Sequence, residues 1–166
     1  MTGEGDGFDG FYSAAYRRIV SQVFALLGDL HEAEDVAQDA FAKASFYWSR
    51  ISAYDAPEAW VRRVAFNLAR NRARRVRRGL VALVRHGPPE QVPAISPDRV
   101  DLHRALRRIP PRHREVLVLR YVAELPVEEM ARQLRLPIGT VKSRLSRARK
   151  ALAEQLGERR EGIRHA

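Results

Sequence analysis

Basic side chains mixed with short polar ones occur in two stretches of the sequence, a mixture typical of surfaces that bind phosphates. In the first stretch, positions spaced four, three and four residues apart share one face of a predicted helix: Arg63, Asn67, Arg70 and Arg74. A second amide, Asn71, lies among them. No acidic residue lies four positions away from these arginines, and unbalanced like charge destabilises a helix unless an anion neutralises it. We therefore predict that this face binds a polyanion, the alternative being an arginine face that is merely solvated.

The second stretch, residues 139–150, contains five basic residues and no acidic residue. On a helical wheel its outward positions carry hydroxyl groups and long basic chains: Thr140, Ser143, Ser146, Arg147 and Lys150, flanked by Lys142, Arg144 and Arg149. Such a helix suits the major groove of DNA, where basic side chains contact phosphates and guanines and hydroxyl groups contact base edges. The alternative is a helical packing unit whose basic exterior is incidental.

Acidic side chains gather near the beginning of the chain, where residues 1–57 carry nine acidic and four basic residues. A helix is predicted from about His31 to Trp48, with one arc of apolar residues for the core: Ala33, Val36, Ala37, Ala40, Phe41, Ala44 and Trp48. Its other side carries acidic and amide groups: Glu32, Asp35, Gln38 and Asp39. Acids near a helix N-terminus are favoured by the helix dipole, so composition alone favours a solvated surface.

Charge changes sign along the chain, although the net charge of the 166 residues is +10. It is −5 over residues 1–57, +7 over residues 58–78, zero over residues 79–99 and +8 over residues 100–166. This order indicates two polyanion contacts and a third, basic partner. The absence of cysteine excludes disulfides, thiol catalysis and thiolate metal sites, and no cofactor is expected. No apolar run approaches the roughly 18 residues of a membrane span and no signal-peptide pattern is present, so we expect a cytoplasmic protein.

The elements that carry these residues are predicted to be helices, because helical periodicity is nearly continuous and strand signals are almost absent. Helices are predicted over residues 8–27, 31–48, 101–109 and 112–122, from Glu58 onward, and as a helix-turn-helix over 127–134 and 139–152. Four prolines and two glycines predict a linker over residues 79–99. The fold is therefore expected to be all-α, with two small helical domains, residues 8–78 and 100–153, and a short charged tail at residues 154–166.

Two local predictions concern the helix that begins near Glu58. Asp55 and Glu58 have the spacing of a capping box, in which two side chains satisfy the free amides of a helix N-terminus. The core-facing stripe of this helix is expected to be apolar: Trp60, Val61, Val64, Ala65, Leu68 and Ala69. In the helix-turn-helix, Ala131 is expected where the two helices cross closely.

Three segments, in this order around a proline-rich linker, resemble the extracytoplasmic-function (ECF) sigma factors, the smallest sigma subunits of bacterial RNA polymerase. The segments are Leu27–Phe41, Pro57–Ala69 and Gly139–Arg149. The similarity covers roughly residues 8–78 and 100–153. One departure is Arg135 in the turn of the helix-turn-helix, where members of the family often carry glycine.

The resemblance implies a role for each candidate surface. Asp35, Gln38 and Asp39 match the face that binds a basic coiled coil of the core polymerase. The helix with Arg63, Asn67, Arg70, Asn71 and Arg74 matches the part that engages the minus-10 promoter element, and the loop Ile51–Ala56 matches the part that receives a flipped base. The last helix matches the reader of the minus-35 element, with Thr140, Lys142, Ser143, Arg144, Ser146, Arg147 and Lys150. The partners implied are RNA polymerase core and promoter DNA, with a monomer when free and no membrane partner; whether an anti-sigma factor binds is left open.

Three alternatives are weighed against this interpretation. A stand-alone helix-turn-helix regulator is the strongest, although such proteins usually dimerise and have no use for an acidic helix beside an arginine helix. A Mg²⁺-dependent nuclease would use a cluster of carboxylates: Asp29, Glu32, Glu34, Asp35 and Asp39. A basic membrane-surface helix over residues 72–85 is interrupted by Gly79 and has a short apolar face.

Overall fold

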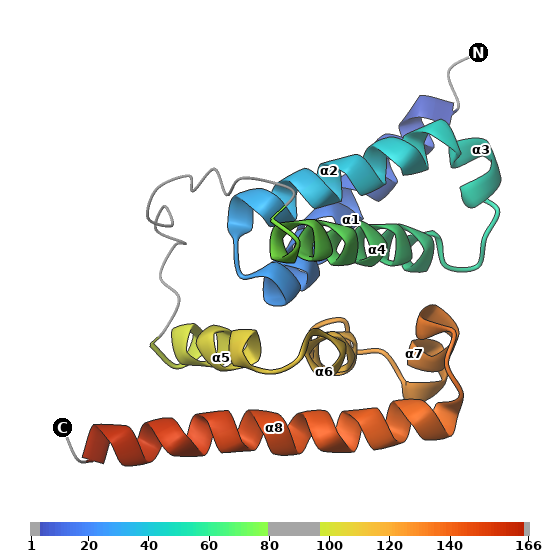
Figure 1. Cartoon of the computed structure of the whole chain (residues 1–166). Helices are drawn as coiled ribbons and strands as arrows, with labels where there is room; N and C mark the ends of the chain where they lie inside the picture. The colour runs from blue at the N-terminus through green and yellow to red at the C-terminus, as the bar shows by residue number, and fades with distance from the viewer. Residues whose placement is uncertain (1–3, 80–96, 165–166) are drawn as a thin grey trace. The chain divides into compact units, whose positions relative to one another are not determined.

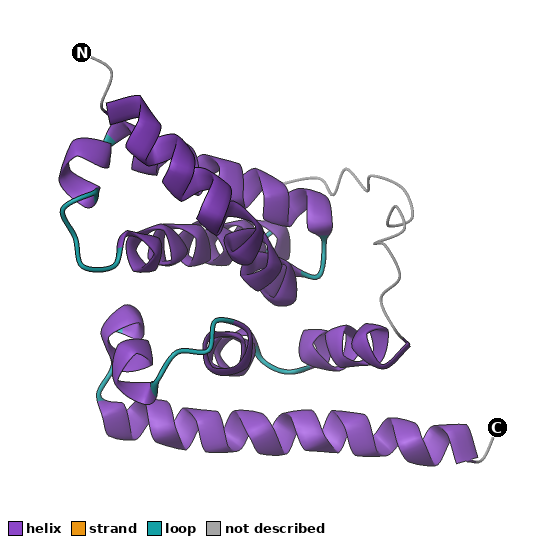
Figure 2. Ribbon diagram, turned by 180° about the vertical axis from the view of Figure 1, so that it is seen from behind, coloured by secondary structure: helices purple, strands orange, loops and turns teal. Residues whose placement is uncertain are grey.

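The computed structural model describes residues 4–79 and 97–164, and every regular element in these two ranges is helical (Figures 1 and 2). The all-α prediction is therefore confirmed. The chain divides into two compact units, one containing α1 to α4 and the other containing α5 to α8. In the part of the chain described, no helix is long and apolar enough to cross a membrane.

The first unit is a three-helix packing arrangement with one short additional helix. Its elements are α1 (Glu4–Leu27), α2 (Leu30–Phe46), α3 (Trp48–Ile51) and α4 (Pro57–Arg77). The helices α1, α2 and α4 each pack against the other two. The predicted apolar arc of α2 is buried from Ala33 to Ala44, and α1, which packs against α2, contributes buried side chains such as Ile19 and Val23. This core fixes which sides of α2 and α4 remain outside.

Local signals explain where these helices start and stop. Gly28, with a φ of 72°, takes the left-handed conformation that ends α1 without the steric penalty of a side chain. Asp29 then caps α2, because its Oδ1 accepts a hydrogen bond of 3.0 Å from the backbone amide of Glu32. The capping box predicted from Asp55 and Glu58 is wrong: Ala56 is the N-cap of α4, without a side-chain hydrogen bond, and the Glu58 carboxylate binds arginines.

The buried stripe of α4 is rotated relative to the prediction. Val61, Ala65 and Ala69 are buried as expected, but Trp60, Val64 and Leu68 are only half-buried. The buried face continues instead through Arg62 and Phe66, which are 6% and 2% exposed. An arginine is rarely buried unless it is paired, and Arg62 finds its partner in α1, far away in sequence. The apolar periodicity of α4 alone therefore predicted a core-facing side that is rotated about the helix axis relative to the buried side in the structure.

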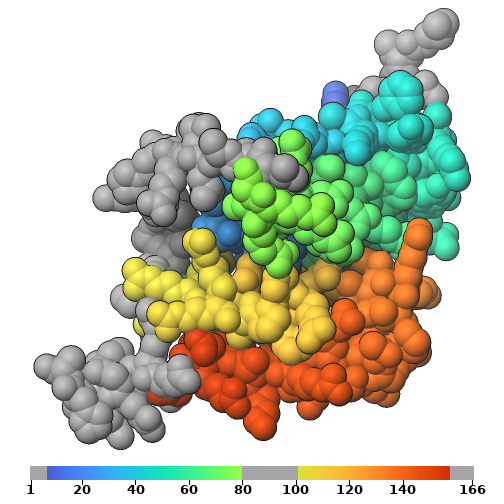
Figure 3. Space-filling view, in the orientation of Figure 1, coloured from blue at the N-terminus to red at the C-terminus, as the bar shows by residue number. Residues whose placement is uncertain are grey.

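The second unit consists of α5 (Pro97–Arg108), α6 (Pro111–Leu117), a π-helical turn η1 (Val118–Val122), α7 (Val127–Leu134) and α8 (Ile138–Arg164). The long helix α8 packs against α5, α6 and α7, and Figure 3 shows its side chains lying along those of α5. The helix predicted over residues 112–122 is thus α-helical only as far as Leu117 and then widens into the π turn.

The last helix is longer than the predicted 139–152, because α8 continues through the charged segment to Arg164. The segment is rich in strong helix formers, and half-buried Leu152 and Leu156 precede its end on the helix that packs against α5. Of the predicted linker, residues 80–96 lie outside the described residues, and α5 already begins at Pro97.

Candidate protein and nucleic-acid interfaces

The first candidate surface is the outer side of α2. Asp35, Gln38 and Asp39 are all exposed there, on the side opposite the buried arc of the helix. The side chains of Asp35 and Asp39 are 63% and 59% exposed. The structure therefore brings the three predicted residues together on one accessible surface, which we call the acidic face.

Arg72 of α4 contacts this acidic face, a neighbour that the sequence analysis missed. Its guanidinium group lies 2.8 Å from Glu32 Oε2, 3.3 Å from Asp39 Oδ2 and 3.8 Å from Asp35 Oδ2. Three of the five carboxylates of the Mg²⁺ alternative, Glu32, Asp35 and Asp39, thus lie against a guanidinium group, while Asp29 caps α2. Within the described residues no three acidic or histidine side chains are grouped as metal ligands would be. Only the opposite charges of the two helices hinted at this contact.

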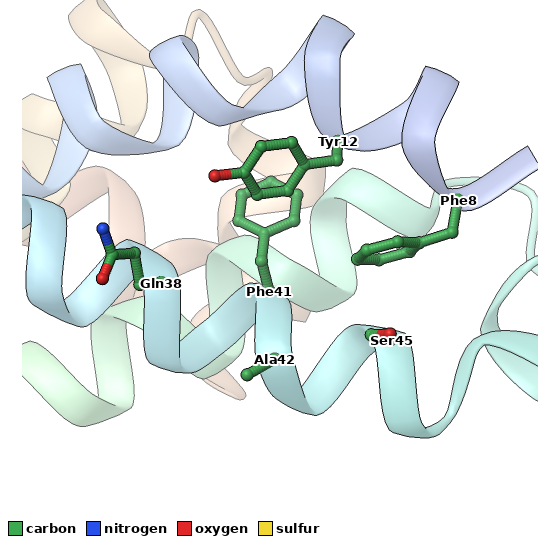
Figure 4. A pocket seen from close by; sticks show the side chains of 6 residues that line it. All are labelled: Phe8, Tyr12, Gln38, Phe41, Ala42 and Ser45. Carbon is green, nitrogen blue, oxygen red and sulfur yellow. The ribbon is translucent and has the colours of Figure 1, made fainter. Parts of the chain in front are cut away.

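An apolar hollow borders the acidic face on the side of α1 (Figure 4). Its lining comes from α1 and α2: Phe8, Tyr12, Gln38, Phe41, Ala42 and Ser45. The rings of Tyr12 and Phe41 meet edge to face at 5.0 Å, and Tyr12 stacks on Tyr16 at 4.9 Å. Burial raises the pKa of Tyr16, while a hydrogen bond from Gln38 acts in the opposite direction. Gln38 therefore belongs to both the acidic face and the hollow.

The second candidate surface is the outer side of α4. Asn67, Asn71 and Arg74 are exposed, whereas Arg63 and Arg70 are half-buried. The Nε of Arg63 is buried and has no hydrogen-bond partner among the described residues. Because α4 is rotated relative to the prediction, Asn67 and Asn71 lie at the centre of the exposed side and the two half-buried arginines lie at its edge.

The loop before α4 lies next to an aromatic pair. Ser52 to Ala56 are exposed, but Ile51 is 1% exposed, so it anchors the segment in the core. The rings of Tyr47 and Trp60 meet edge to face at 6.4 Å across the two ends of this loop. The predicted loop is thus open to a ligand at every residue except Ile51.

A charged network, also missed by the sequence analysis, holds the start of α4 against α1. The buried Arg62 donates from Nε to Gln22 Oε1 at 3.0 Å, and its Nη2 lies 3.5 Å from Glu58 Oε1. Glu58 in turn accepts two hydrogen bonds from Arg18, at 2.6 and 3.2 Å. The Arg18–Glu58 and Gln22–Arg62 contacts each join residues forty positions apart, and they fix the orientation of the outer side of α4.

The third candidate surface is the outer side of α8 in the helix-turn-helix. Lys142, Ser143, Ser146, Arg147 and Lys150 are exposed, and Thr140 and Arg144 are half-buried. Val141 and Leu145 of α8 and Met130 of α7 are buried, the two helices pack together, and Ala131 is 7% exposed. The turn passes through Arg135 with φ 55° and ψ 46°, the left-handed conformation that favours glycine. All seven predicted residues lie on α8; five are exposed on its outer side, and Thr140 and Arg144 lie at the edge of that surface.

Neighbouring elements hold the flanks of this surface. Burial and the charges of Arg112, Arg144 and Arg147 lower the pKa of His113 in α6, which favours its neutral form beside α8. On the other flank, Arg149 Nε donates to Tyr121 Oη at 2.6 Å, and its guanidinium carbon lies 5.7 Å from the centre of the Tyr121 ring. No spacing pattern in the sequence pointed to either contact.

Comparison with known proteins assigns both units. Residues 11–79 match the family described as Sigma-70 region 2, and residues 99–152 match Sigma-70 region 4. The ECF RNA polymerase sigma factor SigW of Bacillus subtilis is 30% identical over 174 residues, which cover 93% of this chain and 91% of that protein. The chain belongs to the ECF sigma factors.

Other similarities agree with this assignment. The RNA polymerase sigma-H factor of Pseudomonas aeruginosa is 30% identical to this chain, and the alignment covers 93% of this chain and 88% of the sigma-H factor. The solved structure of the sigma factor RpoE of Bartonella quintana, in complex with the anti-sigma factor NepR, matches with a TM-score of 0.71 and 25% identity, over 91% of this chain and 97% of that one. CnrH, solved with the cytosolic domain of CnrY, shares the fold with a TM-score of 0.69.

Membership of this family defines the function of the chain. It is an RNA polymerase-binding and DNA-binding subunit of transcription initiation that directs the polymerase to promoters. The family acts as a non-catalytic initiation factor. The match of both regions in one chain also separates it from a stand-alone helix-turn-helix regulator, which would account only for residues 99–152.

Proposed function

We propose a division of labour among three surfaces of this sigma factor. The acidic face of α2 binds core polymerase through Asp35, Gln38 and Asp39. The outer side of α4, with Asn67 and Asn71 at its centre, engages the opened minus-10 element. The outer side of α8 reads the minus-35 element, and residues 8–78 and 100–153 act as the two functional domains joined by the linker 79–99.

The observation that carries the proposal for core binding is the exposed negative charge of Asp35 and Asp39, which remains accessible although Arg72 contacts both carboxylates. The side chains of Asp35 and Asp39 are 63% and 59% exposed and lie on the side of α2 opposite the core, so one arginine leaves most of their surface free for a partner. Complementary charge steers association and selects partners. A basic surface of the polymerase is therefore the partner that fits.

The surface on α4 suits unpaired DNA. Amides offer both donors and acceptors to base edges, and Arg74 adds a phosphate contact. The exposed loop beside Tyr47 and Trp60 offers space for a flipped base, whose unstacking costs a few kcal/mol and is offset by contacts in its pocket. Arg63 and Arg70, which lie at the edge of this surface, complete the proposed minus-10 contact.

The same proposal extends to partners and location. Because RpoE was solved in complex with an anti-sigma factor, we propose an anti-sigma factor as a regulator of this chain as well. Polymerase and promoter DNA occupy the cytoplasm, so we place the protein there, as a monomer when it is not bound to polymerase.

The experiment is a charge reversal on the acidic face. Asp35→Arg should abolish binding to core polymerase, because repulsion replaces attraction, and should leave folding nearly unchanged, because the position is exposed. The matched control is Glu154→Arg, an equal charge change at an exposed position of α8. Binding is measured by fluorescence anisotropy and function by run-off transcription with core. Unchanged core affinity of the Asp35→Arg variant would refute the role of the acidic face.

A further inference from the structure

The outer side of α2 does not end with its acids. Asp35, Asp39, Ala42 and Phe46 are spaced four, three and four residues apart, so they follow one another along one face of the helix. Phe46 is 81% exposed, the highest value among the large hydrophobic side chains of the described residues. The acidic face therefore leads directly to an unusually exposed aromatic ring.

The surroundings of Phe46 are apolar as well. Its ring meets the ring of Tyr47 edge to face at 4.9 Å, and Tyr47 is itself 49% exposed. Ala42, which lies between the acids and Phe46, also lines the apolar hollow (Figure 4). Aromatic side chains carry a large apolar area, and contiguous exposed apolar area beside polar residues marks interaction sites. The register of α2 places position 46 outside, and nothing in the folding of the helix requires an aromatic side chain there.

We infer that Phe46 is the apolar anchor of the polymerase-docking surface, and that its partner is a basic surface of core polymerase that also carries an apolar side chain. This inference rests on the proposed role of the acidic face. Seven residues separate Asp39 from Phe46, about 10 Å along a helix. The partner thus places a basic group on the acids and, about 10 Å away in the direction of the α2 axis, an apolar group against Phe46. Charge selects the partner, and the apolar contact sets the register.

The test compares Phe46→Ala with Phe46→Leu, using the full chain and core polymerase at several salt concentrations. We expect Phe46→Ala to weaken core binding about tenfold, the effect of an interface anchor, and Phe46→Leu to retain most of the affinity. The dependence of log Kd on log salt should stay unchanged for Phe46→Ala, because an apolar contact involves no charge. Asp39→Asn should lower that dependence instead. Leu102→Ala, which shortens an exposed apolar side chain of α5, serves as the control.

Each outcome separates the possibilities. Unchanged core affinity of Phe46→Ala would overturn the inference, and if the permanganate reactivity of promoter thymines were lost at the same time, the ring would instead be assigned to an unpaired base. A reduced salt dependence would also overturn it, because Phe46 would then act through the carboxylates. If Phe46→Ala binds core normally but Asp35→Arg does not, the role of Phe46 is refuted and the role of the acidic face is retained. Normal core binding by Asp35→Arg refutes the role of the acidic face itself.

Discussion

Arg72 offers a quantitative test of how charge on α2 is used. Its guanidinium group neutralises part of the acidic face, so Arg72→Ala leaves Glu32, Asp35 and Asp39 without their common partner. A cation of the polymerase bound to the remaining carboxylate oxygens would lie about 7 Å from Arg72, given the usual lengths of charge-assisted hydrogen bonds. At that distance two like charges in water repel by about 0.6 kcal/mol, equivalent to about threefold in affinity. Arg72→Ala should therefore bind core about three times more tightly at low salt.

Stability and salt provide the internal checks on this prediction. Exposed ion pairs contribute about 0.2–1 kcal/mol, and the three acids are more than half exposed, so the unit should lose little stability. The gain in affinity should disappear as salt screens the charges. Arg75→Ala is the matched control, since it removes an exposed arginine from the same helix without a recorded contact to the acids. Anisotropy titration of labelled protein with core measures the effect. Weaker binding by Arg72→Ala would refute the reasoning and identify Arg72 as a residue that positions the carboxylates.

Two further predictions concern the second unit and the division of promoter contacts. Arg135→Gly should raise the unfolding temperature of the α5–α8 unit by about 4 °C, because it removes about 1 kcal/mol of left-handed backbone strain. An unchanged or lower unfolding temperature in calorimetry would contradict this. Arg147→Ala should weaken binding of holoenzyme to a minus-35 duplex by about tenfold. Asn67→Ala should leave that binding unchanged and lower the permanganate reactivity of thymines in the opened region. The same defect in both variants would show that α4 and α8 do not contact separate promoter elements.

Much of the helical architecture follows from local sequence. The helix-turn-helix was predicted over residues 127–134 and 139–152, and its inward residues Val141, Leu145 and Ala148 are buried. The same holds for the apolar arc of α2 and the exposed acids opposite it. These features depend on the 3.6-residue period of a helix, and both the period and the side-chain types are present in the sequence itself. The resemblance to ECF sigma factors then supplied roles that periodicity alone does not contain.

The tertiary structure decided the features that depend on distant partners. The burial of Arg62 depends on Gln22, forty residues earlier, and this pairing rotates the outer side of α4 so that Asn67 and Asn71 lie at its centre. Arg72 reaches the acids of α2 only because α2 and α4 pack together. A helical wheel records which residues share a face, but the direction of that face is set by the neighbouring helices, because a buried charge is stable only where a partner from elsewhere in the chain meets it.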